Sequence, residues 1–272
     1  MAYRYLWVLL AGSLLVACKK DKTPTDPTIL PPTTSSVLLK DIIIDHLPSP
    51  YYHFEYNSDG RVTHTSIASG LETTNIIYEG DRISEVRSAS VLDANHLKYL
   101  YNFQGQPNVI NYVDQNGITQ KRVVLDYDGP RLVNLERQVR INNSFVTDKV
   151  MEFAYYPDGN LSQLIHHFTI PGSPAVNFTD RFEQYDDKVN VDGFGLLHDE
   201  FFDHLFLLPG IQLQKNNAVK EIRTGDGQNY EATYNYTYND KKAPVQKTGT
   251  LVYTSGPEAG RSFPLNSVFS YY

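Results

Sequence analysis

The stretch "FAYYPDGNLSQLIHHF", residues 153–168, decides the fold. Phe153 and Tyr155 alternate with other side chains, and an Asp-Gly pair follows at 158–159. Alternation with a period of two is typical of a β-strand that buries one face. An Asp-Gly pair favours a tight turn, because glycine adopts a positive φ without steric penalty. Aliphatic residues resume at Leu161, so the stretch predicts a β-hairpin.

The same phrase recurs along the chain: an aromatic residue and a tyrosine, a short turn, a polar or basic residue, and then aliphatic residues. Further copies begin at Phe54, Ile76, Tyr99, Val124, Phe182 and Tyr236. The tyrosines Tyr56, Tyr78, Tyr101, Tyr127, Tyr155 and Tyr185 follow one another at intervals of 22 to 30 residues. The repeat predicts an all-β fold, a large antiparallel meander of stacked hairpins with roughly a dozen or more strands. Because large flat sheets are unusual, we expect the sheet to curl or close.

Composition agrees with strands and excludes one class of partner. The chain of 272 residues contains 20 tyrosines and 13 phenylalanines, and aromatic residues favour strands. Its net charge of −7 and the lack of a basic patch argue against nucleic acid as a partner. Residues 37–272 are expected to form a single domain, since all-β domains of this size often stay undivided.

Residues 1–17 have the layout of a secretory signal peptide. Arg4 gives the start a positive charge, and an apolar run, Leu6–Val16, follows. This run is too short to span a bilayer as a helix, which needs about 20 residues. The single cysteine of the chain, Cys18, comes almost directly after it.

The sequence Leu15-Val16-Ala17-Cys18 resembles the lipobox of bacterial lipoproteins. The resemblance implies that Cys18 is acylated, so that the membrane is a partner through an N-terminal lipid anchor. The alternative is a secreted protein with an ordinary cleavage site. Residues 18–36 are rich in proline and threonine and are predicted to be a lipidated, disordered tether.

The tyrosine-turn-aliphatic phrase resembles the YD/Rhs-type hairpin repeat. The mature chain as a whole resembles Bacteroidota lipoproteins of unknown function that have a porin-like, many-stranded antiparallel fold. The matching pieces are "YDDKVN" at 185–190, "LQKNNAVKEI" at 213–222 and "YNYTYNDKKAPVQK" at 234–247. The resemblance implies an outer-membrane lipoprotein that faces the periplasm or the cell surface, and it carries no activity. One departure is Lys242-Ala243-Pro244, where the repeat usually has a Gly-x-Pro turn.

One segment, residues 192–214, breaks the strand pattern. Leu197, Phe201, Leu205 and Leu208 have the spacing of one helical face, and Pro209-Gly210 ends the pattern. We therefore expect one short helix near residues 196–208, packed over an open edge or end of the sheet. Its polar side chains Asp199, Glu200, Asp203 and His204 form i,i+4 pairs that are weak candidates for a metal site. A solvated polar face is the simpler interpretation, and we expect no metal and no cofactor.

Two further patterns concern binding. The neighbours His166 and His167 should point to opposite faces of a strand and so should not share a ligand. The tyrosines Tyr56, Tyr101, Tyr127, Tyr155 and Tyr236 could stack against a sugar, although aromatic pairs in the sheet core are the simpler interpretation.

We therefore predict a binding or scaffolding module of the cell envelope rather than an enzyme, with a glycan or another envelope protein as its partner. The first alternative is a carbohydrate-active hydrolase with an acidic site near residues 198–204. The second is a transmembrane β-barrel, which would need an apolar outer belt about 25 Å tall.

Overall fold

The hairpin predicted from the opening stretch is present as strands β10 (Ser144–Tyr155) and β11 (Leu161–Phe168). In the turn between them, the Tyr156 amide donates to the Asn160 carbonyl, and the Gly159 amide donates to the Tyr156 carbonyl. Gly159 has a φ of 96°, which is the conformation that favours glycine. The Asp-Gly turn is therefore confirmed.

The computed structural model describes residues 37–89, 96–169, 174–197 and 207–272, all within the unit formed by residues 31–272. The other strands are β1 (Leu39–Ile44), β2 (Tyr52–Tyr56), β3 (Val62–Ile67), β4 (Glu72–Glu79), β5 (Arg82–Ser88), β6 (His96–Tyr101), β7 (Pro107–Val113), β8 (Thr119–Asp128), β9 (Arg131–Ile141), β12 (Val176–Val189), β13 (Asn216–Gly225), β14 (Tyr230–Tyr238), β15 (Pro244–Tyr253) and β16 (Ser262–Tyr271). Two short 3₁₀ helices, η1 (Ala68–Gly70) and η2 (Gly193–Leu196), interrupt them.

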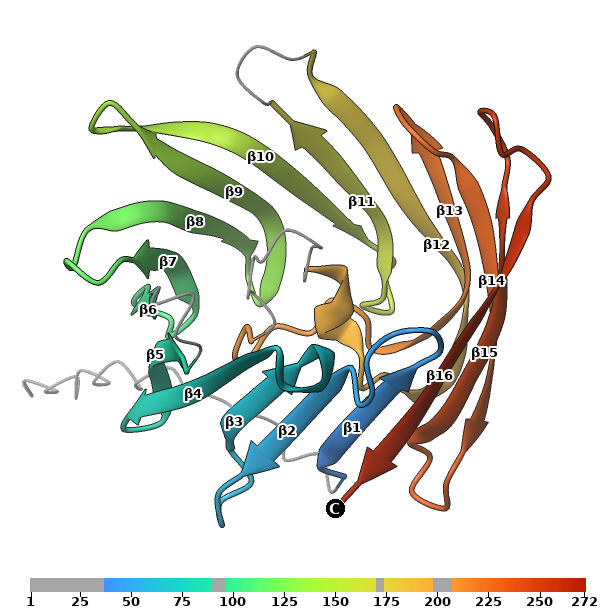
Figure 1. Cartoon of the computed structure of the whole chain (residues 1–272), viewed down its shortest axis with the longest axis horizontal. Helices are drawn as coiled ribbons and strands as arrows, with labels where there is room; N and C mark the ends of the chain where they lie inside the picture. The colour runs from blue at the N-terminus through green and yellow to red at the C-terminus, as the bar shows by residue number, and fades with distance from the viewer. Residues whose placement is uncertain (1–36, 90–95, 170–173, 198–206) are drawn as a thin grey trace, which may run out of the picture. The chain divides into compact units, whose positions relative to one another are not determined.

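Each strand pairs antiparallel with the next along the chain, and β1 pairs with β16, so that the sheet closes into a barrel. Figure 1 looks into this barrel and shows the blue β1 beside the red β16. At the closure, Leu39 stands opposite Tyr271 and Ile44 opposite Ser267. The predicted all-β meander is confirmed, and of the predicted shapes the sheet adopts the closed one. Closure leaves no unpaired edge that could recruit another strand.

Alternation along the strands separates a buried inner face from an outer face. In β10, Lys149, Met151 and Phe153 are buried, whereas Glu152 and Ala154 are exposed. The inner side chains of β4 to β12 form one large apolar cluster, and those of β1, β2, β3 and β16 form a second, smaller one. The core therefore lies inside the barrel.

The repeated tyrosines link each hairpin to the one before it. Near its C-terminal end, every even-numbered strand carries a tyrosine whose hydroxyl donates to a carbonyl near the start of the preceding strand. The pairs are Tyr56 with Leu39, Tyr78 with Val62, Tyr101 with Ile83, Tyr127 with Pro107, Tyr155 with Leu132, Tyr185 with Leu161, Tyr236 with Ala218, and Tyr271 with Pro244, at 2.5 to 3.1 Å. We call these eight residues the tyrosine ring. Because each bond joins neighbouring hairpins, the ring fixes the stagger between them.

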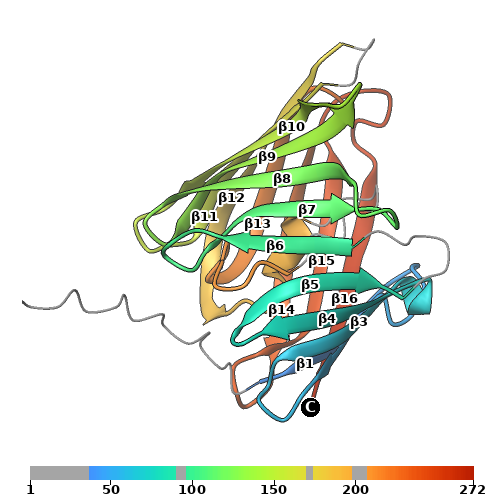
Figure 2. The ribbon, with the colours of Figure 1, turned by 90° about the vertical axis from the view of Figure 1, so that its left-hand side faces the viewer.

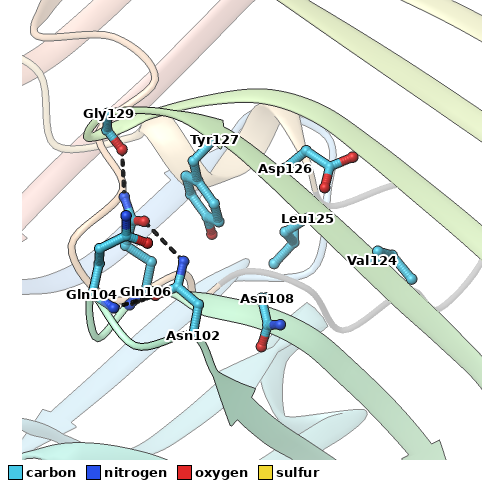
Figure 3. Close-up of a pocket in the computed structure, with 9 residues that line it drawn as sticks. All are labelled: Asn102, Gln104, Gln106, Asn108, Val124, Leu125, Asp126, Tyr127 and Gly129. Carbon is cyan, nitrogen blue, oxygen red and sulfur yellow. Dashed lines mark hydrogen bonds between the residues drawn. The ribbon is translucent and has the colours of Figure 1, made fainter.

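The turns next to the tyrosine ring repeat their own hydrogen bonds. In the turn after β6, the Asn102 side-chain oxygen accepts from the amides of Gln104 and Gln106, each at 3.0 Å. The Gln106 side chain then donates to the carbonyl of Gly129 in the next turn at 2.8 Å. Figure 3 shows these contacts around a surface depression of about 240 Å³ beside Tyr127. Polar bonds between turns thus continue the register that the tyrosines set.

The connection between β12 and β13 folds into the barrel. We call its described residues, 190–197 and 207–215, the plug. Leu197 and Leu213 are buried in the large apolar cluster. The Tyr99 hydroxyl donates to the Leu207 carbonyl at 2.8 Å, and the Leu161 amide donates to the Leu213 carbonyl at 3.1 Å. Figure 1 shows η2 surrounded by the strands, and Figure 2 shows it between the green strands in front and the orange and red strands behind.

The predicted helix near 196–208 falls mainly on residues outside the described ranges. Of the two positions predicted for it, an open edge is excluded because the sheet closes into a barrel, and an end of the sheet stays a prediction; the described residues Leu197 and Leu213 pack in the large apolar cluster. Among the described residues, no helix has the length and apolar character needed to cross a membrane.

Candidate functional site

Several residues singled out in the sequence lie outside the described ranges. They are Cys18, Asp199, Glu200, Asp203 and His204. Lipidation at Cys18 and the weak metal and hydrolase candidates therefore stay predictions. Within the described ranges, no group of three or more His, Cys, Asp or Glu side chains is arranged to hold a metal ion.

The five candidate stacking tyrosines all belong to the tyrosine ring. Tyr56, Tyr101, Tyr127, Tyr155 and Tyr236 are half-buried, and each uses its hydroxyl on a backbone carbonyl. Burial raises the pKa of Tyr101 to about 12, although the nearby Arg82 opposes the shift. A hydroxyl that stays protonated can keep donating to the carbonyl over the physiological pH range. These rings thus have a structural role, and their stacking against a ligand stays a prediction.

The lumen contains a cavity of about 690 Å³ that the sequence did not predict. Side chains from β10 to β16 line it, together with Asn190, Asp192, Gly195 and Leu196 of the plug. Its aromatic lining is Phe168, Phe178, Phe182, Tyr230, Tyr234, Tyr236 and Phe269. Its titratable lining, apart from the tyrosines, is Lys149, His166, Asp180, Asp192, Glu221, Arg223 and Lys247. A cavity of this size that mixes aromatic walls with a few polar groups has the properties of a small-molecule site.

One charged cluster on the cavity wall centres on Asp180. The Arg223 guanidinium donates two hydrogen bonds to its carboxylate, at 2.6 and 2.7 Å. His166 Nε2 lies 3.2 Å from Asp180 Oδ2. Burial alone would raise the pKa of Asp180, but the hydrogen bonds from Arg223 and the nearby His166 outweigh it and hold that pKa below its ordinary value. Asp180 is therefore a fixed negative charge that orients Arg223.

An aromatic ring holds both partners of Asp180 in place. His166 stacks on Phe178 at a centroid distance of 4.2 Å, and Arg223 lies 4.3 Å from the centre of the same ring. Burial lowers the pKa of His166 below its ordinary value, although Asp180 opposes the shift, so the imidazole is neutral at pH 7. His166 faces the lumen, whereas His167 faces outward and contacts Asn177 at 2.7 Å. The prediction that the two histidines point to opposite faces is confirmed.

A second cluster surrounds Glu221. The Tyr230 and Tyr234 hydroxyls donate to its two carboxylate oxygens, at 2.6 and 3.0 Å. Burial, followed by the negative charge of Glu221, raises the pKa of both tyrosines, so both remain protonated donors. Lys247 Nζ lies 4.3 Å from the centre of the Tyr234 ring. The carboxylate of Glu221 thus accepts hydrogen bonds from protein side chains, as that of Asp180 does.

The third carboxylate on the lining, Asp192 of the plug, differs from these two. Among the described residues, no donor makes a hydrogen bond or ion pair with its side chain. Burial raises the pKa of Asp192 above its ordinary value, and the charge of Lys247 opposes that shift. Gly195 lies close to this carboxylate. A residue with a Cβ at position 195 would place that atom only 3.1 Å from Asp192 Oδ1, so glycine leaves the carboxylate room.

Two rows of outward residues on the barrel are polar or charged, although an outward apolar row, Leu100, Val109 and Val124, lies beside one of them. Across β5 to β10, the outward residues Glu85, Lys98, Asn111, Arg122, Gln138 and Thr147 stand opposite one another in successive strands. Across β12 to β15, the outward row is Glu183, Lys220, Thr233 and Thr250. Neighbours in these rows interact: Lys98 lies 3.5 Å from Glu85, and Arg122 donates to Gln138 at 2.6 Å. A wall that faces lipid would need an apolar band at these positions.

Comparison with known proteins gives matches among solved structures. A scan against protein-family models finds no match, and no curated protein matches. The fold is similar to that of a porin-like protein from Bacteroides uniformis ATCC 8492, with a TM-score of 0.57, 14% identity, and coverage of 86% of this chain and 95% of that one. It is also similar to a porin-like protein from Bacteroides vulgatus ATCC 8482, with a TM-score of 0.58, 14% identity, and coverage of 86% and 98%. At this identity, the likeness shows a shared barrel fold.

Proposed function

We propose that this chain is a lipid-anchored protein of the bacterial outer membrane whose barrel stands outside the bilayer and binds a small ligand in its lumen. The signal-peptide layout and the lipobox around Cys18 support the anchor. The porin-like neighbours from Bacteroides support an envelope location. The barrel then faces the periplasm or the cell surface at the end of the tether of residues 18–36.

The charged residues in two rows of the outer face carry the argument that the barrel does not span the membrane. An Arg or Lys on the lipid-facing side of a transmembrane barrel costs about 2–4 kcal/mol at the bilayer midplane. Lys98, Arg122 and Lys220 occupy outward positions, together with Glu85 and Glu183. Inside, by contrast, the lining is largely apolar and aromatic. This arrangement is the reverse of a porin wall and suits a barrel in water.

The luminal cavity supports binding as the activity. Its volume of about 690 Å³ suits a small molecule and excludes a folded protein. Of the two partners predicted from the sequence, a glycan is therefore the better occupant. Two of the lining carboxylates already hold protein donors, an arrangement that fixes side chains for recognition. We infer that the protein binds its ligand rather than transforming it.

The location is tested by removing the anchor with Cys18→Ala in the native host. We expect the variant to appear in the soluble fraction, while the wild-type chain stays with the outer membrane. Retention of the variant in membranes after an alkaline wash would show that the barrel itself is inserted and would contradict the proposal. Mass spectrometry of the wild-type chain checks the acylation of Cys18 directly.

Luminal binding is tested by substituting two phenylalanines that each contact an arginine, one in the cavity and one on the outer face. Phe178 lines the cavity 4.3 Å from the Arg223 guanidinium, and Phe145 lies on the outer face 4.2 Å from that of Arg122. Native mass spectrometry and a glycan array on the purified full chain should show that Phe178→Ala weakens binding. Phe145→Ala should leave binding unchanged. Equal loss in both variants would place the ligand elsewhere.

A further inference from the structure

The three carboxylates on the cavity lining differ in how the protein satisfies them. Asp180 receives two hydrogen bonds from Arg223, and Glu221 receives one from each of two tyrosines. For Asp192, the described residues provide no donor. Asp192 is half-buried and lines the cavity, so its carboxylate is open to a positively charged partner that arrives with the ligand.

Lys247 does not neutralise Asp192 by a direct contact. No ion pair within 4.0 Å joins the two among the described residues, and the Lys247 ammonium lies instead over the Tyr234 ring at 4.3 Å. The lining as a whole carries three carboxylates and three permanent cations, Lys149, Arg223 and Lys247. Of the three carboxylates, Asp180 and Glu221 accept hydrogen bonds from described residues, and Asp192 is the one for which these residues supply no donor.

The surroundings of Asp192 are aromatic. Tyr236 stands opposite Lys247 in the β14–β15 register, and both line the cavity. Asp192 lines the same cavity as Tyr234 and Tyr236. Burial, and after it the charge of Asp192, raises the pKa of Tyr236, Tyr52 and Tyr271. A carboxylate among aromatic faces is the arrangement by which proteins hold organic cations.

We infer that the luminal cavity binds a small organic molecule carrying an ammonium group, with the ammonium at Asp192 and the rest of the molecule against Tyr234 and Tyr236. This inference rests on the proposed luminal binding and specifies its ligand class. A sugar with an unacylated amino group belongs to this class, as does an alkylammonium compound. A metal ion fits less well, because the amide oxygens of Asn190 and Gln214 already accept hydrogen bonds from within the protein.

Matched probes can test the charge requirement with the purified full chain. Glucosamine and glucose differ by an ammonium in place of a hydroxyl, and hexylammonium and hexanol differ in the same way. By isothermal titration calorimetry, we expect the ammonium member of at least one pair to bind about ten-fold more tightly, the effect of about 1.4 kcal/mol of charge pairing. Hexanoate should bind more weakly than either. The pair that responds identifies the body of the ligand.

Three variants locate the binding. Asp192→Asn keeps the shape of the side chain and should remove the preference for the ammonium probe. Lys247→Met removes the competing positive charge and should tighten ammonium binding by about three- to ten-fold. Asp126→Asn, on the outer face of β8, is the control and should change nothing.

The outcomes separate this inference from the proposed function. If the chain binds both glucose and hexanol as tightly as their ammonium partners, or if Asp192→Asn keeps the preference for the ammonium probe, the ammonium site is wrong while luminal binding stands. If Phe178→Ala also leaves all binding unchanged, luminal binding itself fails. Tighter binding of hexanoate than of hexylammonium would reverse the assigned charge.

Discussion

Tyrosines serve two purposes in this barrel, and the contrast between the two regions is informative. In the tyrosine ring, eight hydroxyls donate to backbone carbonyls in one repeated geometry. On the cavity wall, the Tyr230 and Tyr234 hydroxyls donate to one carboxylate, Glu221, and no other strand repeats the arrangement within the described ranges. A contact that recurs in every hairpin has a structural role, whereas a contact that occurs once is a candidate for a role in function.

The largest effect that can test this contrast comes from the cavity wall. Arg223→Met removes both hydrogen bonds to Asp180, whose side chain is only 5% exposed. Because a buried charge is then left without its partner, we expect a loss of about 3 kcal/mol in the free energy of unfolding at pH 7. Urea denaturation followed by circular dichroism measures it.

The pH dependence of the same variant adds a second measurement. The pKa of Asp180 is lowered in the folded chain, so its ionised form contributes stability above the pKa of the unfolded state. That contribution disappears as the pH falls through the folded pKa. Arg223→Met should therefore flatten the dependence of stability on pH in the acid range. Arg181→Met, at an exposed outward position of β12 next to Asp180, is the control and should stay within about 0.5 kcal/mol of wild type.

The tyrosine ring should respond more weakly and more uniformly. Tyr127→Phe deletes only the hydroxyl that donates to the Pro107 carbonyl at 2.6 Å. We expect a loss of about 1 kcal/mol in the free energy of unfolding, because one neutral hydrogen bond is removed. The same substitution at Tyr101 or Tyr155 should cost a similar amount, and none of the three should change ligand affinity.

The control for the ring is Tyr253→Phe in β15. Among the described residues, its hydroxyl has no hydrogen-bond partner, and its ring packs against Phe263 at 5.3 Å. This substitution should stay within about 0.5 kcal/mol of wild type. Equal costs at Tyr253 and Tyr127 would mean that the ring hydroxyls do not fix the hairpins.

The same contrast explains what the sequence could and could not predict. The tyrosine ring was visible because its signal repeats locally: each copy places a tyrosine, a turn and an aliphatic residue within a few positions. The hairpins, the alternation and the opposite faces of His166 and His167 followed from that periodicity. Closure of the sheet was one of two predicted shapes, since pairing of β1 with β16 joins the two ends of the chain.

The cavity could not be predicted, because its contacts join residues that are far apart in sequence. Asp180 and Arg223 are 43 positions apart, and Glu221 reaches Tyr234 on the next strand. Each residue alone fits an ordinary strand. The plug also escaped prediction, since helix-like spacing in 192–214 shows an apolar face but does not show that this face turns inward. The signal that could have been used is the inward position of Asp180 between the apolar residues Phe178 and Phe182.

The smallest expected effect concerns a turn that departs from the repeat. Lys242 has a φ of 62°, and its amide donates to the Asn239 carbonyl just as the amide of Gly60 donates to Asn57. A left-handed backbone conformation costs a residue that has a side chain about 1 kcal/mol, and glycine avoids this cost. Glycine also loses more conformational entropy on folding, which offsets part of the gain. Lys242→Gly should therefore stabilise the barrel by about 0.5 kcal/mol.

The neighbouring residue supplies the control for this turn. Asp240 has no positive φ, so Asp240→Gly should lower the free energy of unfolding by about 0.5 kcal/mol. Both variants can be measured in parallel by urea denaturation, with ligand affinity expected to stay at the wild-type value. Opposite signs at two positions of one turn would show that the backbone conformation sets the preference for glycine. A loss of stability in Lys242→Gly would mean that the lysine side chain makes a contribution that outweighs the strain.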